Sequence, residues 1–417
     1  MLDSIRRVLG GNTHAHVLAL FLVVLMLVFH VATGGRALTY ANLQTMLASN
    51  VYLLILTIGM MMVVTIGQID LSVGSVAAFT SMTVALLMHN HGFPWWAGLL
   101  VGLLIGAAIG TAQGILIALV GIPGVIVTLA GMMIFRGADL WESRALSIPV
   151  PPEFQFLGAG YLPEWGPTWT QMNNSTLVLG IIVAAITVTA SVRRYLKHVR
   201  GSGNEPETGL IVARSAAIIA VVGLVTWLFG HGATGTSFPI PGILLLVILW
   251  VFHLLTQRTA FGRHMYAVGG NQTAAALAGV DTRKVQIAVM AIMGCLAALA
   301  GMVFAGRSTA AGPQDGSLWE LEAIAAVFIG GAAVSGGIGT VTGAVLGGLV
   351  MASLNNGLML LGIGGDRAQI IKGIVLLIAV TFDIYQRRAG RPSVSGRLFP
   401  GGNTAGGVGM RASAGHS

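Results

Sequence analysis

Charge is the property that this sequence has least of. Only 9% of its 417 residues are Asp, Glu, Lys or Arg, against roughly 25% in soluble domains. Between Arg36 and Arg136 the only such residue is Asp70, which excludes an ordinary water-facing surface over that stretch. With 55% hydrophobic residues and 59 glycines, the composition predicts an all-α integral membrane protein, because close helix packing in lipid favours small residues.

The sequence also lacks the residues that several kinds of chemistry require. Its single cysteine, Cys295, excludes an intramolecular disulfide and is expected to be a packing residue. No glycine is followed by lysine, which excludes a G-x-x-x-x-G-K-[ST] phosphate loop. The histidines are scattered and no H-E-x-x-H motif occurs, so we expect no metal, no cofactor and no catalytic residues. If ATP drives this protein, another chain must bind it.

Long apolar stretches are what the sequence has instead. Several of them are shorter than the roughly 20 residues that a full span requires. We therefore expect a polytopic helical bundle of about 10–12 spans with some broken or re-entrant helices. The stretches lie near residues 17–33, 50–69, 72–88, 95–120, 122–135, 174–192, 211–229, 240–256, 285–305, 319–335, 340–361 and 369–385.

The charges of the connecting segments predict the topology. Basic segments at 193–214, at 257–284 and after residue 385 alternate with more acidic ones at 137–173 and 306–322. Because cytoplasmic loops collect Lys and Arg, an even number of crossings places every basic segment and both termini in the cytoplasm. The same rule explains the net charge of +8, which therefore does not indicate nucleic acid binding.

Two pairs of short matches suggest an inverted repeat. Gln113-Gly-Ile-Leu-Ile-Ala-Leu resembles Asn356-Gly-Leu-Met-Leu-Leu, and Ser75-Val-Ala-Ala-Phe resembles Ala323-Ile-Ala-Ala-Val-Phe. On the expected topology the two members of each pair cross the membrane in opposite directions. Inverted repeats frame a substrate path at their interface in many transporters, although apolar sequence also matches itself by chance.

Asp70 lies in the segment T-I-G-Q-I-D-L-S-V-G-S. A second span that rises about 1.5 Å per residue reaches the inner face of the membrane near this point. We expect Asp70 to be the N-cap of the next helix, with Gly67 and Gly74 allowing a tight turn. The alternative is a discontinuous helix at a translocation path, in which Asp70 or Gln68 contacts a polar solute.

The cytoplasmic segment that starts at Thr259 reads T-A-F-G-R-H-M-Y-A-V-G-G-N-Q-T-A-A-A-L-A-G-V. Its Ala-rich piece, residues 272–279, is long enough for a short helix closed by Gly279. Isolated helices of this length are marginal in water. We therefore expect the piece to dock, either on the protein's own inner face or on a partner.

Several motifs, taken in order, resemble one family. F-G-R-x-x-Y-A-x-G-G-N-x-x-A-A-x-x-A-G-V, starting at Phe261, and G-Q-I-D-L-S-V-G-S at 67–75 resemble the permeases of ribose/xylose-type bacterial ABC importers. A-I-A-A-V-F-I-G-G, G-G-I-G-T-V-x-G-A-x-L-G and I-I-K-G-I-V-L-L-I-A-V, found between residues 323 and 380, agree as well. Xylose permeases are the nearest likeness, because they carry an insertion similar to residues 174–230.

The resemblance implies a transmembrane permease domain at 1–388, with an inserted pair of spans at 174–230 and an ATPase-coupling loop at 257–284. It implies a disordered cytoplasmic tail at 389–417. The implied activity is import of a monosaccharide, xylose or a related pentose, across the bacterial inner membrane. The implied partners are an ATP-binding cassette ATPase, a periplasmic sugar-binding protein, a second permease copy and membrane lipid. The residues expected at the ATPase contact are Gly269, Gly270, Asn271, Ala274, Ala275, Ala276 and Gly279.

A sugar crossing a dry pathway needs hydrogen-bond partners, which directs attention to polar residues near the spans. An ion-coupled secondary transporter of a small polar solute is the alternative function, but this chain offers few membrane-depth carboxylates for an ion relay. Some of the polar residues could equally link one helix to another. The candidates for the translocation path are Gln68, Asp70, Thr80, Thr128, Asn355 and Asn356.

Overall fold

The computed structural model describes residues 13–166, 170–202, 208–231 and 237–388. The described part is almost entirely helical, as predicted, and has one short two-stranded antiparallel sheet. Its elements are α2 (Thr13–Ala32), α3 (Tyr40–Thr65), α4 (Val73–His91), α5 (Trp95–Ile115), the π-helical turn η1 (Leu116–Val120), α6 (Gly124–Ser143), β1 (Ile148–Pro149), α7 (Pro152–Ala159), α8 (Asn174–Ser202), α9 (Thr208–Gly230), α10 (Ile240–Arg258), α11 (Ala260–Gly270), α12 (Gln272–Leu277), α13 (Thr282–Ser308), β2 (Ala310–Ala311), α14 (Trp319–Ile329), α15 (Val341–Leu360) and α16 (Gly365–Arg388).

Ten helices in the described residues are long and apolar enough to cross a membrane. This number agrees with the expected 10–12. The apolar stretch near 319–335 is not among the ten, because its helix α14 has only 11 residues. The expected tail at 389–417 lies outside the described residues.

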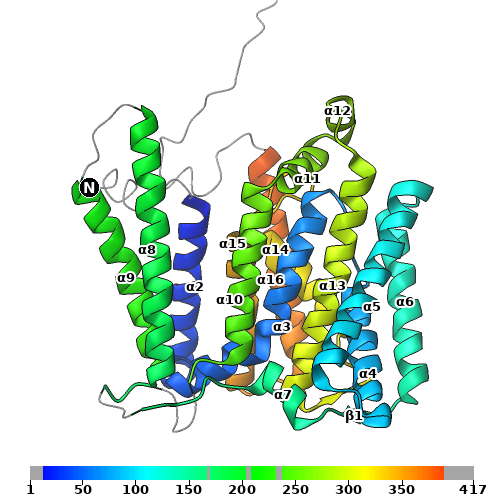
Figure 1. Cartoon of the computed structure of the whole chain (residues 1–417), viewed down its shortest axis with the longest axis horizontal. Helices are drawn as coiled ribbons and strands as arrows, with labels where there is room; N and C mark the ends of the chain where they lie inside the picture. Colours follow the sequence, from blue (N-terminus) through cyan, green and yellow to red (C-terminus); the bar gives the residue numbers. More distant parts are fainter. Residues whose placement is uncertain (1–12, 167–169, 203–207, 232–236, 389–417) are drawn as a thin grey trace, which may run out of the picture.

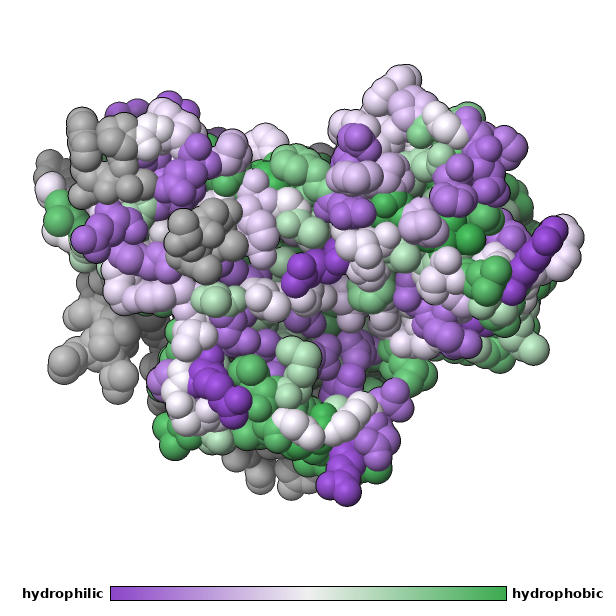
Figure 2. All heavy atoms as spheres, turned by 90° about the horizontal axis from the view of Figure 1, so that it is seen from below, coloured by the Kyte–Doolittle hydropathy of each residue, from purple (hydrophilic) through white to green (hydrophobic). Residues whose placement is uncertain are grey.

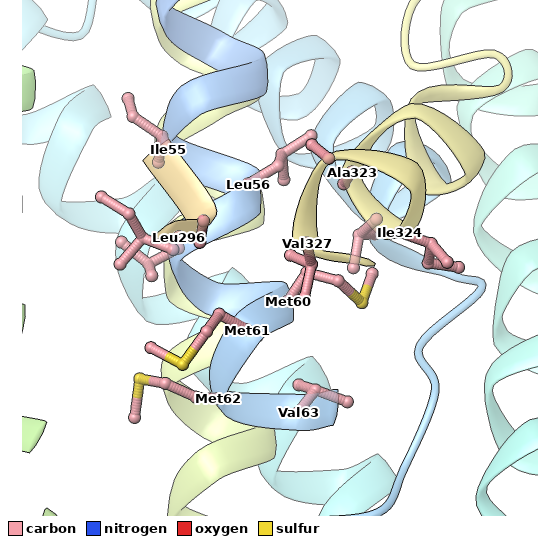
Figure 3. Packing of buried hydrophobic residues seen from close by; sticks show 14 of the residues in the cluster. Ile55, Leu56, Met60, Met61, Met62, Val63, Leu296, Ala323, Ile324 and Val327 are labelled. Carbon is pink, nitrogen blue, oxygen red and sulfur yellow. The ribbon is translucent and has the colours of Figure 1, made fainter. Parts of the chain in front are cut away.

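α3 is the central helix of the bundle. Apart from Tyr52, every side chain from Asn50 to Thr65 is buried, as expected for a helix that is hydrophobic on all sides. Figure 3 shows Met60, Met61 and Met62 beside side chains from α13 and α14. Methionine fills irregular gaps well because its side chain is unbranched and flexible.

The bundle contains two units that pack in corresponding ways, α3–α6 and α13–α16. In each unit a long helix is followed by a non-helical segment and then by a helix, α4 or α14. α4 and α5 pack on α13, and α14 and α15 pack on α3. The two matched motifs occupy corresponding places, because Ser75 and Ala323 lie near the starts of α4 and α14 and Gln113 and Asn356 lie in α5 and α15. This is the arrangement that an inverted repeat produces.

The two non-helical segments meet inside the bundle. A Cβ atom on Gly74 would collide with the carbonyl oxygen of Gly316, and one on Gly316 would collide with the carbonyl oxygen of Gly74. Gly316 also has a φ of +72°, which favours glycine. The start of α4 therefore touches the segment that precedes α14, so the breaks in both units lie at one place.

The tightest helix pair joins the two units. α5 presents glycines every fourth residue to α13, and a Cβ on Gly106 or Gly110 would collide with the backbone of α13. Such small-xxx-small spacing allows two helix backbones to approach closely within a membrane. The glycines that face α13 are Gly102, Gly106, Gly110 and Gly114, and Gly98 continues the row against α4.

α8 and α9 form a separate hairpin at the left of Figure 1. None of the side chains in the apolar window of α9 is buried. The hairpin is held through Gln44, whose amide donates to the carbonyl oxygens of Phe229 and Ser237 at 3.0 and 3.1 Å. Tyr40 and Trp227 add an edge-to-face ring contact. This hairpin corresponds to the pair of spans expected at 174–230.

The basic segments gather at one end of the molecule. In Figure 1, α11, α12, the start of α2 and the end of α16 lie at the top, whereas α7 and β1 lie at the bottom. The order matches the topology expected from the loop charges, with the top as the cytoplasmic end. We use "cytoplasmic end" and "periplasmic end" for these two ends below.

Candidate functional site

α11 is a helix that the sequence did not predict. It begins after Thr259, whose side chain accepts the amide hydrogen of Gly262 at 3.2 Å as an N-cap. Two of its own side chains, Met265 and Val268, are buried. The Tyr266 hydroxyl donates to the carbonyl oxygen of Gly339 at 2.7 Å, which ties α11 to the start of α15.

The end of α11 rests on the end of α3. A Cβ on Gly269 would collide with the carbonyl oxygen of Thr65, so only glycine allows this approach. The same carbonyl oxygen accepts the amide hydrogen of Gly337 at 2.8 Å. Gly270, in contrast, has open space around it. A push on α11 would therefore reach α3 and the broken segment that follows it.

α12 follows at once and lies at the cytoplasmic tip of the molecule (Figure 1). Its N-cap is Asn271, whose side chain accepts the amide hydrogen of Ala274 at 2.9 Å. Gly279 has a φ of +84° and follows its C-cap, as expected for a residue that ends the helix. Asn271 and Gly279 therefore have the structural roles that the sequence predicted.

Ala275 does not. Only 5% of its surface is exposed, because it packs against the helices of its own chain. The prediction that it faces a partner is wrong. The other residues of α12 are all exposed: Gln272, Thr273, Ala274, Ala276 and Leu277. Leu277 is the one large apolar side chain among them, and 86% of its surface is exposed.

A short turn after α12 leads into α13. Asp281 is the N-cap of α13 and accepts the amide hydrogen of Lys284 at 3.1 Å. This backbone hydrogen bond is the main reason that the pKa of Asp281 lies below its usual value. The α11–α12 element thus lies between two N-caps, Thr259 at the start of α11 and Asp281 at the start of α13.

Asp70 lies in the non-helical segment between α3 and α4. Its carboxylate accepts the amide hydrogen of Ser72 at 2.8 Å and the Ser72 hydroxyl at 2.6 Å. The N-cap of α4 is Ser72, so the expectation that Asp70 itself caps this helix is wrong. Asp70 instead closes the turn just before the cap. The Gln113 amide of α5 donates to the Ser72 hydroxyl at 2.9 Å and joins this turn to the next helix.

The other candidates in this unit are satisfied locally or lie at its margin. Thr80 is buried and donates to the carbonyl oxygen of Val76 in its own helix at 2.6 Å. Thr128 of α6 donates to the carbonyl oxygen of Ile69 at 3.2 Å and holds the broken segment. Gln68 is half-buried beside Gly124 at the start of α6.

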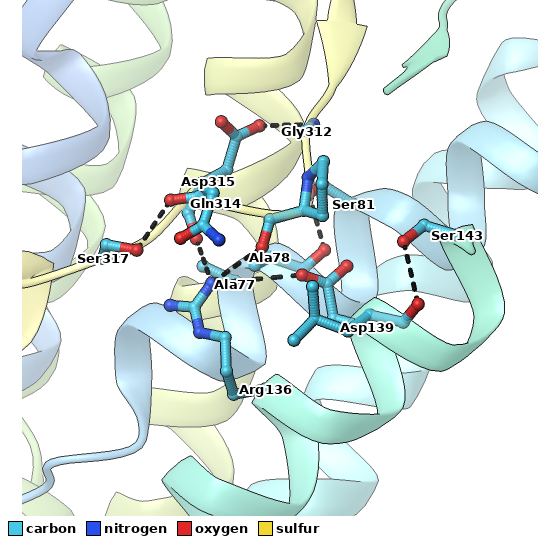
Figure 4. Close-up of polar contacts among 12 residues, drawn as sticks. Ala77, Ala78, Ser81, Arg136, Asp139, Ser143, Gly312, Gln314, Asp315 and Ser317 are labelled. Carbon is cyan, nitrogen blue, oxygen red and sulfur yellow. Dashed lines mark hydrogen bonds and ion pairs between the residues drawn. The ribbon is translucent and has the colours of Figure 1, made fainter. Parts of the chain in front are cut away.

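Arg136 of α6 links the two units, as Figure 4 shows. Its guanidinium donates to the carbonyl oxygens of Pro313 and Asp315 at 3.3 and 2.7 Å. The carboxylate of Asp139 lies 4.0 Å away and is fully buried. Neither oxygen of Asp139 has a hydrogen-bond partner in the described part of the chain. Neither residue of this pair was predicted from the sequence.

A second polar network lies in the α13–α16 unit. Glu322 of α14 is hydrogen-bonded to Lys372 of α16 through one oxygen. Its other oxygen accepts from the Asn355 amide at 3.2 Å, and that amide also reaches Asn50 of α3 at 3.5 Å. Asn355 was predicted from the sequence as a path residue, whereas Glu322 and Lys372 were not. A lone lysine inside the apolar stretch 369–385 was the signal that could have found them.

Asn356 lies one residue further and makes a different contact. Its side chain exchanges two hydrogen bonds with the Asn42 side chain of α3, at 2.9 and 3.0 Å. Both amides are thereby satisfied by each other. Asn356 therefore links helices, which was the alternative that the sequence left open.

Three aromatic rings border the Glu322 network. The ring of Tyr52 lies 4.1 Å from that of Trp319 and 5.2 Å from that of Phe304. Tyr52 comes from α3, Phe304 from α13 and Trp319 from α14, one turn before Glu322. Figure 2, seen from the periplasmic end, shows hydrophilic and hydrophobic residues interspersed over that face. Among the described residues, no group of His, Cys, Asp and Glu could hold a metal ion.

Comparison with known proteins decides the family. The family described as "branched-chain amino acid transport system / permease component" matches residues 42–149 and 157–380. The chain belongs to this permease family. The xylose transport system permease protein XylH of Escherichia coli (strain K12) is 33% identical over 383 residues, which cover 90% of this chain and 93% of XylH.

Two further relatives extend the comparison. The ribose import permease protein RbsC of Bacillus subtilis (strain 168) is 33% identical over 369 residues, covering 88% of this chain and 91% of RbsC. The probable ABC transporter permease protein YphD of Escherichia coli (strain K12) is 39% identical over 163 residues, or 39% of this chain and 48% of YphD. No solved structure matches the chain. The resemblance read from the motifs is confirmed, and the permease is a multi-pass protein of the bacterial inner membrane.

Proposed function

We propose that this permease is the membrane subunit of an ATP-binding cassette importer that carries a monosaccharide, xylose or a related pentose, into the cell. The relatives that cover most of this chain have names that refer to xylose or ribose. The family description refers to branched-chain amino acids, so the relatives rather than the family favour a sugar. The α8–α9 hairpin adds to the likeness with xylose permeases.

The observation that carries the proposal is the α11–α12 element. It lies outside the ten apolar helices at the cytoplasmic end, presents an exposed Leu277, and rests through Gly269 on the end of α3. A partner that grips α12 would thereby move the broken segment that contains Asp70. Because the chain has no phosphate-binding loop, that partner is the subunit that binds ATP.

The remaining partners follow from the same division of labour. A periplasmic sugar-binding protein delivers the sugar at the end that carries α7 and β1. A second copy of the permease completes the pathway, and lipid covers the exposed apolar sides of α6, α9 and α16. The charge distribution does not favour nucleic acid binding, since the basic segments lie at the cytoplasmic end.

The direct test is uptake of labelled xylose by proteoliposomes that contain the permease, its ATPase and a loaded binding protein. We expect accumulation that requires ATP and the binding protein and that persists when an ionophore collapses ion gradients. Uptake that continues without ATP and stops with the ionophore would favour the ion-coupled alternative. Uptake of leucine but not of any pentose would overturn the substrate class.

A substitution in α12 tests the coupling element separately. Leu277→Glu places a charge on an exposed position, so the permease should fold normally but lose its ATPase on co-purification. Ala276→Glu should act in the same direction. Ala275→Glu, in contrast, should destabilise the permease itself, because Ala275 is buried. The matched control is Phe156→Glu, an exposed apolar position on α7 at the other end of the molecule.

A further inference from the structure

The Glu322–Lys372 ion pair is unusual for its surroundings. Both side chains are largely shielded, with 14% and 18% of their surfaces exposed. Taking two charges out of water is costly, and their attraction often does no better than apolar packing in the same place. α4, which corresponds to α14 in the other unit, has no charged residue at all. The pair is therefore not a requirement of this helix arrangement.

The rings of Tyr52 and Trp319 give the pair a second feature. They lie 4.1 Å apart and are tilted by 31°, so the buried Trp319 ring packs on the Tyr52 ring and fixes its position. Tyr52 is half-buried although its neighbours on α3 are buried. Its hydroxyl makes no hydrogen bond to the described residues. A phenol with a free hydroxyl beside an ion pair can donate to, and accept from, a further group.

We propose that Glu322, Lys372, Asn355 and Tyr52, which is held in place by Trp319, form the site at which the permease contacts its sugar. This inference rests on the proposed function and deepens it. A pentose has one face of C–H groups, which suits the ring of the half-buried Tyr52, and an edge of hydroxyls, which suits a phenol, a carboxylate, an ammonium and an amide. These residues come from α3, α14, α15 and α16, so the site lies where the two units meet.

The charges also fit an uncharged solute. Glu322 and Lys372 are paired with each other, and the second oxygen of Glu322 is taken by Asn355. The network is therefore neutral as a whole, and a sugar hydroxyl can join it without leaving a charge unpaired. A zwitterionic amino acid would have to separate the pair in order to bind both of its ends.

The test separates a binding role from a structural one. Glu322→Gln and Lys372→Met each leave a buried partner unpaired, so each should lose stability for structural reasons alone. The double variant Glu322→Gln/Lys372→Met has no unpaired charge and should recover the thermal stability of the wild type. We expect this double variant to keep ATP hydrolysis that is stimulated by the loaded binding protein. Its sugar transported per ATP should fall about ten-fold, as the loss of a charge-assisted hydrogen bond implies.

Two further variants complete the experiment. Tyr52→Phe removes only the free hydroxyl and should lower the sugar transported per ATP without a change in stability, because the sugar loses one hydrogen-bond partner. The matched control is the double variant Asn42→Ala/Asn356→Ala, which removes a polar link between α3 and α15. It should transport as much sugar per ATP as the wild type.

The outcomes distinguish this inference from the proposed function. If the wild type moves no pentose with ATP, the proposed function itself fails. If the wild type transports and the double variant moves as much sugar per ATP as the wild type, the proposed function stands. In that case the Glu322–Lys372 pair only ties α14 to α16, and the inference is wrong. Inhibition of wild-type xylose uptake by leucine would also contradict the site's preference for an uncharged solute.

Discussion

The α3–α6 and α13–α16 units pack in corresponding ways but differ in where their polar groups lie. In the first unit, the Asp70 carboxylate is satisfied by Ser72, two residues away in the sequence. In the second, Glu322 is satisfied by Asn355 and Lys372, which come from two other helices. At its break, the first unit thus uses the Asp70 carboxylate to shape a turn, whereas the second uses the Glu322 carboxylate to join three helices.

The difference shows how one arrangement can serve two purposes. A carboxylate bound by its own backbone is held whatever the neighbouring helices do. A carboxylate bound by other helices changes its surroundings whenever those helices move. The broken segments of both units meet at Gly74 and Gly316, so the two units are in direct backbone contact at their breaks.

The largest effect should come from separating the units at their meeting point. Gly74→Val would drive a side chain into the backbone of Gly316, where neither backbone has room to shift. We expect almost no folded protein after detergent extraction and size-exclusion chromatography. Gly137→Val, on the open side of α6, is the control and should give a normal yield. Equal yields for the two variants would mean that the units do not meet closely here.

The next effect concerns Arg136, which connects α6 to the segment before α14. Arg136→Gln removes its bonds to the carbonyl oxygens of Pro313 and Asp315 and leaves the buried Asp139 without a cation. We expect a loss of about 3 kcal/mol, measured as a lower melting temperature in detergent. The double variant Arg136→Gln/Asp139→Asn should recover part of it, and no recovery would show that Asp139 is not charged.

Asp70 should tolerate substitution better than Glu322. Asp70→Asn keeps an oxygen that accepts the Ser72 amide hydrogen, so transport should stay near the wild-type level. Asp70→Leu removes that oxygen and should cost about 2 kcal/mol of stability, because the Ser72 amide is left without its partner. Complete loss of transport in a stable Asp70→Asn protein would instead place Asp70 in the sugar path.

The smallest effect should come from the Asn42–Asn356 pair. Asn356→Ala breaks two hydrogen bonds between α3 and α15, and side-chain hydrogen bonds within membrane bundles average about 0.6 kcal/mol. We expect a melting temperature only slightly below that of the wild type, and unchanged sugar transport. A large loss of transport would return Asn356 to the path, where the sequence first placed it.

The spans and the topology could be predicted from the sequence because they depend on composition and on the charges of connecting segments. The ends of α12 were also predictable, since Asn271 and Gly279 act on their own neighbours. Local chemistry of this kind is visible in a single sequence.

The parts that could not be predicted depend on contacts between distant segments. Lys372 meets Glu322 across 50 positions, and no spacing rule connects them. The burial of Ala275 could not be predicted, because its neighbours Ala274 and Ala276 are residues of the same type. The Asp70 turn was assigned to the wrong residue because Asp and Ser are both good N-caps and stand two residues apart.

One measurement tests the central claim, that an ATPase grips this permease at α12, most directly. The chain has a single cysteine, so Cys295→Ala provides a background for new cysteines. In that background, Leu277→Cys should be joined to the ATPase by a short linker that reacts with a thiol and an amine. Glu153→Cys, on α7 at the periplasmic end, should not be joined. A Leu277→Cys permease that supports ATP hydrolysis by its ATPase but never cross-links to it would contradict the account.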